Sequence, residues 1–206
     1  MVFLNRGNHF EASPLPQEAQ WSAAFTPVVA DFDGDGHEDI FLSQNFAHNQ
    51  PEVPRLDAGR GLMLQGDGRG QFQTVDGSKT GILIYGDQRG AAAADYDADG
   101  RVDLVVTQNG AETRLLHNQT ARPGLRVRLS GPPGNPGGVG AVIRLKSGGQ
   151  WGPAREIHGG SGCGSQDDTV QVLGTVRLPE AVQVRWPGGA ITETAAGDEK
   201  EMFIRR

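Results

Sequence analysis

The sequence predicts an all-β fold, and three observations lead to this. Glycine accounts for 31 and proline for 12 of the 206 residues, a composition that suits short strands and tight turns better than long helices. No stretch carries apolar residues at sustained helical spacing. Two similar acidic strings recur, and the apolar, β-branched segments that follow them are typical of buried strands.

Charge and composition exclude several classes of partner. The chain has 19 basic and 25 acidic residues, a formal net charge of −6, and no basic block, which argues against a nucleic-acid partner. No run of about twenty apolar residues is present, so no membrane insertion is expected. Cys163 is the single cysteine, which precludes an internal disulfide. The opening "MVFLNRGNHF" lacks the pattern of a signal peptide and is predicted to start with a strand.

The acidic strings are "DFDGDGHEDI" at 31–40 and "DYDADGRVDL" at 95–104, which begin 64 positions apart. Their D-x-D-x-D-G-x-x-D spacing is that of a calcium loop, because alternate carboxylates can curl around one hard cation that prefers oxygen ligands. Position 7 typically offers a backbone carbonyl. The predicted ligands of the two calcium ions are Asp31, Asp33, Asp35, the carbonyl of His37 and Asp39, and then Asp95, Asp97, Asp99, the carbonyl of Arg101 and Asp103.

The loops differ from an EF-hand, which needs a carboxylate at position 12 and a helix on each side. Position 12 is Leu42 in the first loop and Val106 in the second. We therefore place each loop between two strands. The alternative is an Asp/Gly-rich surface turn that binds no ion, and the repetition of the same ligand spacing counts against it.

The repeat extends beyond the acidic strings. Before the first stands "VFLNRGNHFEAS" and before the second "LMLQGDGRGQFQTV", each an apolar strand, a glycine turn and a strand centred on phenylalanine. After the second comes "TRLLHNQT", which resembles the start of a further unit. Repeated units of several short strands indicate stacked sheets, most often the blades of a β-propeller. Polar residues 47–61 between the loops are predicted to form an exposed connection.

These motifs resemble FG-GAP/VCBS repeats over residues 1–120, in "ADFDGDGHEDIFLSQN" and "AADYDADGRVDLVVTQNG". The resemblance implies blades of an integrin-like propeller with calcium in a hairpin of each blade. Two repeats cannot close a ring, since propellers need about four to eight blades. We therefore expect further blades upstream in a longer chain, or an oligomer partner.

Composition changes near residue 120, and residues 121–206 are predicted to form a small antiparallel β-sandwich or barrel. "LRVRLS", "AVIRLKS", "AREIH", "TVQVLG" and "KEMFIRR" are predicted strands, and "AVQVRWPGGAITE" is a predicted hairpin. This half resembles the ASPIC/UnbV domain of the cartilage acidic protein family. The resemblance lies in Asn135, Gly140, Ala141, Ser165, Gln166, Trp186, Pro187 and Gly189. Two stretches depart from that family: "SGCGSQ" lacks an aromatic residue, and "VQVLGT" replaces Phe-Gly-Leu-Gly.

The glycine-rich stretch "HGGSGCGSQDD" at 158–168 holds a histidine, a cysteine and two aspartates. Because a strand rather than a helix is expected after it, we predict a tight turn without a catalytic role for His158 or Cys163, and solvated Asp167 and Asp168. Of the three tryptophans, Trp186 is expected in the core. Trp21 and Trp151 lie in polar or Gly/Pro-rich surroundings where they could be exposed and stack on sugars, but packing in the core or against loops is the favoured interpretation for them as well.

Two functions fit these features. The resemblance implies a calcium-stabilised, non-enzymatic adhesion module that binds protein or carbohydrate surfaces. The alternative is a calcium-dependent lyase, dehydratase or hydrolase of sugars built on a propeller. Extracellular calcium modules typically bind the ion at about 10⁻⁴–10⁻³ M, which favours a secreted or extracytoplasmic location.

Overall fold

The computed structural model describes residues 1–46, 52 and 54–206. Part of the predicted exposed connection, residues 47–51 and 53, lies outside the described residues. The elements of the first half are β1 (Val2–Asn5), β2 (Phe10–Ser13), the 3₁₀ helix η1 (Gln17–Gln20), β3 (Ala24–Ala30), β4 (Asp39–Gln44), β5 (Leu62–Gly66), β6 (Phe72–Val75), α1 (Gly77–Thr80), β7 (Asp87–Ala94), β8 (Asp103–Asn109) and β9 (Ala111–Leu116). Those of the second half are β10 (Leu125–Ser130), β11 (Val142–Ser147), β12 (Gln150–Trp151), β13 (Arg155–Glu156), β14 (Gln171–Leu173), β15 (Pro179–Arg185), β16 (Ile191–Ala195) and β17 (Glu201–Arg205).

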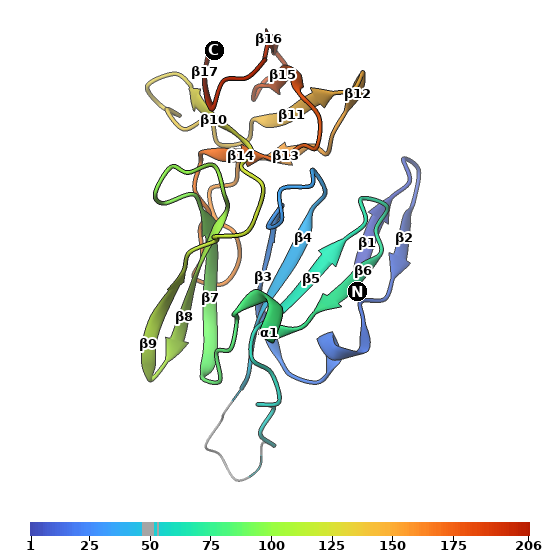
Figure 1. The fold of residues 1–206 in the computed structure, drawn as a ribbon, viewed down its shortest axis with the longest axis vertical. Helices are drawn as coiled ribbons and strands as arrows, with labels where there is room; N and C mark the ends of the chain where they lie inside the picture. Colours follow the sequence, from blue (N-terminus) through green and yellow to red (C-terminus); the bar gives the residue numbers. More distant parts are fainter. Residues whose placement is uncertain (47–51, 53) are drawn as a thin grey trace.

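The fold is mostly β and consists of several small sheets. The first half forms the hairpin β1-β2, a four-stranded sheet β3-β4-β5-β6 and a three-stranded sheet β7-β8-β9, all antiparallel. The second half forms the sheet β14-β10-β17 and a five-stranded sheet in which β12, β13 and β15 pair with β11, and β16 pairs with β15. Among the described residues, no sheet closes into a barrel and no ring of blades is formed. Figure 1 shows the second half seated on the ends of the first-half sheets.

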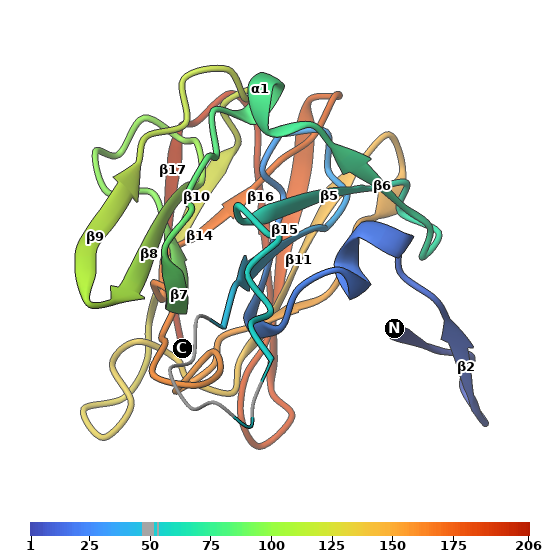
Figure 2. The same cartoon turned by 90° about the horizontal axis from the view of Figure 1, so that it is seen from below.

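Strand β4 is buried along its whole length because apolar layers cover both of its faces. Phe41 is fully buried in the cluster shared with β7 and β8, whereas Ile40 and Leu42 belong to the cluster with Leu64 of β5. This division follows the alternation of side chains along a strand. The first cluster joins the two sheets, so β3–β6 and β7–β9 pack on each other, as Figure 2 shows from below.

The second half has a core of its own, to which both of its sheets contribute. Val127 of β10, Ile143 of β11 and Val182 of β15 are fully buried there. Trp186 is 1% exposed and its indole N–H donates to Thr192 Oγ1 at 2.9 Å, which confirms its prediction as a core residue. The predicted hairpin also forms, with Trp186 N–H donating to Ala190 O at 2.8 Å.

Two expectations about the fold need correction. The second half is not purely antiparallel, since β17 runs parallel to β10. Met202 and Ile204 of β17 face the core as their alternation predicts, but alternation carries no information about strand direction. The chain is also not entirely β. The turn of α1 forms because Asp76 Oδ1 accepts the N–H of Ser78 and Gly81 ends the helix at φ +73°. No helix in the described part of the chain is long and apolar enough to cross a membrane.

Candidate metal centre

The first acidic loop connects β3 to β4 and is organised around the carboxylate of Asp31. This carboxylate accepts the backbone N–H groups of Gly34 at 2.8 Å, Asp35 at 3.1 Å and Gly36 at 2.8 Å. Gly34 and Gly36 have φ of +75° and +94°, conformations that glycine adopts without a Cβ clash. The chain therefore curls around Asp31, which is 3% exposed.

The second loop, between β7 and β8, repeats this arrangement around Asp95. Asp95 accepts the N–H groups of Asp99 at 3.0 Å and Gly100 at 2.9 Å. Where the first loop has Gly34, the second has Ala98 at φ +63°. Two stretches 64 residues apart thus reach the same backbone path with different residues at the left-handed position.

The ninth residue of each loop secures the loop to a neighbouring segment. Asp39 accepts the N–H of Phe32 and the N–H of Gly66 on β5, both at 2.9 Å. Asp103 accepts the N–H of Tyr96 at 3.2 Å and that of Asn118 at 2.7 Å. Asp39 and Asp103 are 2% and 1% exposed. Both oxygens of each carboxylate are held in place, which orients them toward the interior of the loop.

Three groups of acidic and histidine side chains have ligand atoms within 4.8 Å of one another, which suits a shared metal ion. They are Asp31 with Asp33 and Asp39, Asp95 with Asp97 and Asp103, and Asp97 with Asp99 and His117. The first two groups match the first, second and last carboxylates predicted for each loop. Their all-oxygen donor set and mutual distances fit calcium, which takes oxygen ligands at about 2.3–2.6 Å.

The third carboxylate of each predicted set lies outside these first two groups. Asp35 accepts the N–H of His37 at 2.8 Å and faces His37 Nδ1 at 3.2 Å. Asp99 accepts the N–H of Arg101 at 2.8 Å and pairs with its guanidinium. Asp35 and Asp99 are thus held by the residue at position 7 of their loop, His37 or Arg101. The carbonyl of that residue is the ligand predicted from the sequence.

Burial raises the pKa values of the two anchoring carboxylates of the first loop, Asp31 and Asp39, and so makes them weaker acids. Desolvation raises the pKa of Asp31 to about 6, opposed by the nearby charge of Arg155 and the N–H bonds of Gly36 and Gly34. Desolvation also raises the pKa of Asp39 to about 7, again against backbone hydrogen bonds. In the second loop, desolvation raises the pKa of Asp103. A cation would relieve this cost, because it replaces the water that the buried carboxylates have lost.

Both loops lie against the second half of the chain. The N–H of Arg122 donates to Asp33 O at 3.1 Å, and that of Gly124 donates to Gly100 O at 2.8 Å. Arg126 on β10 donates its Nε–H to Asp95 Oδ2 at 2.8 Å; the two side chains are 10% and 0% exposed. The loops are therefore the joint between the two halves.

The contact between the first acidic loop and the second half is closely packed as well as polar. A Cβ on Gly174 would lie 1.9 Å from Asp31 Oδ2, so only glycine fits there. Arg155 Nε–H donates to Glu38, the residue before Asp39, at 2.5 Å, and its guanidinium also reaches Val172 O. No local sequence pattern marks Gly174, Arg126 or Arg155 as part of these sites, because each lies far along the chain from its loop.

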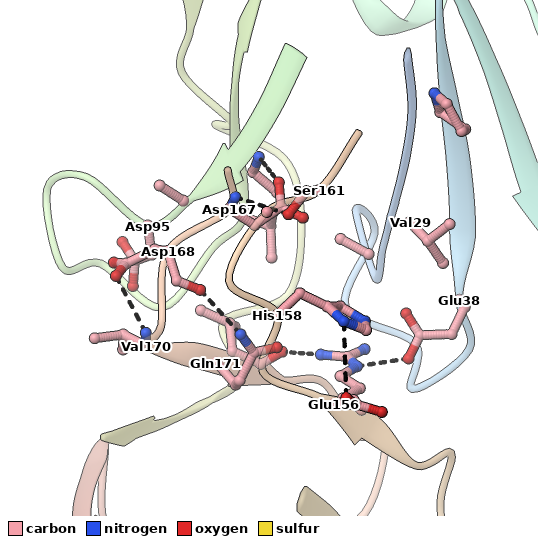
Figure 3. A pocket seen from close by; sticks show the side chains of 18 of the residues that line it. Val29, Glu38, Asp95, Glu156, His158, Ser161, Asp167, Asp168, Val170 and Gln171 are labelled. Atoms are coloured by element: carbon pink, nitrogen blue, oxygen red, sulfur yellow. Dashed lines mark hydrogen bonds and ion pairs between the residues drawn. The ribbon is translucent and has the colours of Figure 1, made fainter. Parts of the chain in front are cut away.

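A cavity of about 450 Å³ lies between the loops and the second half. Figure 3 shows Glu38, Glu156 and His158 on one side of it and Asp95, Asp167 and Asp168 on the other. Its lining contains no aromatic ring other than the imidazole of His158 among the described residues.

The glycine-rich stretch 158–168 lines this cavity and lies along β7. Ser165 Oγ accepts the N–H of Ala91 at 3.0 Å, and Asp167 Oδ1 accepts that of Ala93 at 2.7 Å. The prediction that Asp167 is solvated is therefore wrong: it holds the edge of β7. A tight turn is confirmed by the N–H of Ser161 donating to Ser165 O at 2.8 Å. Cys163 is exposed, and no contact between it and His158 is found among the described residues.

Residues 131–198 match the family described as ASPIC and UnbV. The chain contains an ASPIC/UnbV domain. The resemblance noted in the sequence is thereby confirmed for residues 131–198, and the hydrophobic core that these residues build also includes side chains of β10 and β17 on either side of them. No curated protein matches the chain.

Proposed function

We propose that the protein is a calcium-stabilised, non-enzymatic binding module of an extracytoplasmic adhesion protein, which recognises protein or glycan surfaces. The observation that carries the proposal is the repetition of one loop geometry. Asp31 and Asp95 both accept the N–H groups of the fifth and sixth loop residues, and each joins two further carboxylates within reach of one ion. An Asp/Gly-rich surface turn that binds no ion would not need its ninth carboxylate, Asp39 or Asp103, to be buried close to its first, Asp31 or Asp95.

Calcium in this proposal holds the two halves of the protein in one arrangement. One ion would be bound by Asp31, Asp33 and Asp39 in the first loop, and a second ion by Asp95, Asp97 and Asp103 in the other. Each ion would supply the positive charge that these buried carboxylates otherwise lack. Since the same loops contact Arg122, Gly124 and Arg126, ion binding would stiffen the joint with the ASPIC/UnbV domain.

The repeats are proposed to be FG-GAP/VCBS blades of a larger propeller. Sheet β3-β4-β5-β6 has the order expected of a four-stranded blade, and β7-β8-β9 repeats its first three strands. Hairpin β1-β2 corresponds in sequence to β5-β6 but pairs only with itself among the described residues. An upstream blade, or a second copy of the chain, would give β1-β2 a sheet to join.

One observation favours the enzymatic alternative, a calcium-dependent sugar lyase, dehydratase or hydrolase. His158 Nδ1 lies 4.0 Å from Glu156 Oε1 at the edge of the 450 Å³ cavity. The two side chains are 58% and 51% exposed, so neither is shielded from water as a tuned acid or base usually is. Turnover of a uronate or ketose sugar that is lost in His158→Ala would establish this alternative.

Thermal melting with EGTA and then with calcium tests the calcium proposal. At free calcium one hundredfold above the dissociation constant, each site stabilises the fold by about 2.7 kcal/mol, or roughly 5–10 °C in Tm. The double variant Asp33→Asn/Asp97→Asn keeps an oxygen for the N–H groups of Asp35 and Asp99 and should lose most of this shift. Asp198→Asn, an exposed acid elsewhere, is the matched control. No shift in the unmodified protein, or an equal shift in the double variant, would contradict the proposal.

A further inference from the structure

A second and larger cavity, of about 730 Å³, lies on the other side of the first acidic loop. Its wall on the propeller-like half includes Asp35 and His37 of the loop and Phe72 of β6. Its wall on the ASPIC/UnbV domain includes Trp151 and Arg177. The size is in the range of small-molecule sites, and residues from both halves contribute.

The two aromatic residues set this cavity apart from the one in Figure 3. Phe72 and Trp151 are both half-buried, so part of each residue remains accessible. The ammonium group of Lys146 lies 5.8 Å from the centre of the Trp151 ring. An indole held in this way offers a flat apolar face, against which the C–H bonds of a sugar ring can pack.

Polar groups without a protein partner surround the aromatic rings. Among the described residues, no hydrogen bond or ion pair engages the Gln150 amide, the Arg177 guanidinium or the Trp151 indole N–H. His37 faces Asp35 through Nδ1, which leaves Nε2 available. Arg177 lies against Gly148, where a Cβ would meet its Nη1 at 2.1 Å, so glycine makes room for it.

The charge balance of this cavity differs from that of the whole chain. The chain carries −6, whereas the formally charged lining residues are two acids, Asp35 and Glu38, and two arginines, Arg155 and Arg177. Glu38 pairs with Arg155 and Asp35 faces the imidazole of His37, so among the described lining residues Arg177 is the cation without an ion-pair partner. A guanidinium with free N–H groups favours a carboxylate, which it can bind through two parallel hydrogen bonds.

We infer that this cavity binds an acidic saccharide, with a sugar ring stacked on Trp151 and a uronate carboxylate paired with Arg177. Gln150 and His37 supply hydrogen bonds to ring hydroxyls. The inference rests on the proposed function, of which it names the ligand class. It also connects ligand to metal, because Asp35, Gly36 and His37 belong to the first calcium loop and line the cavity.

Isothermal titration calorimetry at constant excess calcium tests the inference. The ligands are tetragalacturonate and a neutral tetrasaccharide with the same linkage. We expect binding of the acidic saccharide, weakened at least tenfold in Trp151→Ala and in Arg177→Ala. The matched controls are Trp21→Ala, a residue that is 56% exposed and does not line the cavity, and Arg114→Ala, whose side chain is 57% exposed on β9. Melting curves and calcium shifts of all variants show whether each is folded.

The outcomes separate this inference from the proposed function. Equal binding by Trp151→Ala and Trp21→Ala overturns the cavity assignment but leaves a glycan-binding module. No binding of either saccharide, with the calcium shift intact, overturns the ligand class and leaves a protein surface as the partner. Loss of the calcium shift itself overturns the proposed function. Stronger binding of the neutral saccharide overturns the role given to Arg177.

Discussion

The ion pair between Arg126 and Asp95 provides the sharpest test of how the acidic loops and the second half of the chain depend on each other. The Asp95 side chain is 0% and the Arg126 side chain 10% exposed, and Arg126 also pairs with Glu201 at 3.1 Å. Replacing Arg126 by methionine keeps most of the side-chain volume but leaves Asp95 buried without its cation. Breaking a buried pair from one side costs about 3–5 kcal/mol.

The effect of Arg126→Met should depend on calcium. In EGTA the full cost applies, which corresponds to a fall in Tm of roughly 6–20 °C. In saturating calcium the ion neutralises Asp95, so the fall in Tm should be less than half as large. The variant should therefore show a larger calcium shift than the unmodified protein.

Differential scanning calorimetry in EGTA and in calcium measures both shifts, with urea unfolding as a second measure of stability. Arg128→Met is the matched control, because Arg128 lies two residues along the same strand, is 48% exposed and contacts only Glu201, at 3.5 Å, as an ion-pair partner among the described residues. It should change Tm little in either buffer. If Arg126→Met lowers Tm equally with and without calcium, its effect is one of packing, and calcium binding is not coupled to the Arg126–Asp95 pair.

Three further predictions concern the loops themselves. Gly34→Ala should destabilise the protein by at least 2 kcal/mol in urea unfolding, because φ is +75° and the Cβ would lie 2.1 Å from Arg122 O; an unchanged midpoint would refute this packing. Ala98→Gly should stabilise by up to about 1 kcal/mol, since it removes the cost of φ +63° for alanine; a lower midpoint would show that Ala98 is unstrained. In EGTA, stability should fall by roughly 5–6 kcal/mol as pH rises from 4 to 7, because the pKa values of about 6 for Asp31 and about 7 for Asp39 exceed the ordinary value of 3.8 and the folded state binds the extra protons. Saturating calcium should flatten or reverse that slope, and a rise with pH in EGTA would contradict the assignment.

The sequence by itself determined the elements that depend on interactions between residues close together in the chain. The strand–loop–strand units around Asp31 and Asp95 follow from carboxylate spacing and glycine position, which act over nine residues. The strands of the second half, and the buried position of Trp186, follow from alternation of apolar and polar residues. Predictions of this kind need no knowledge of distant segments.

Tertiary structure alone decided which distant residues the loops contact and where the cavities lie. Arg126, Arg155 and Gly174 reach the loops from sites 31 to 143 residues away, and nothing in their neighbouring residues marks that contact. The parallel pairing of β17 with β10 and the cavity beside Trp151 likewise depend on how separate segments meet. The physical reason is that spacing along the chain specifies local backbone paths, whereas contacts between distant segments are selected by the packing of the whole fold.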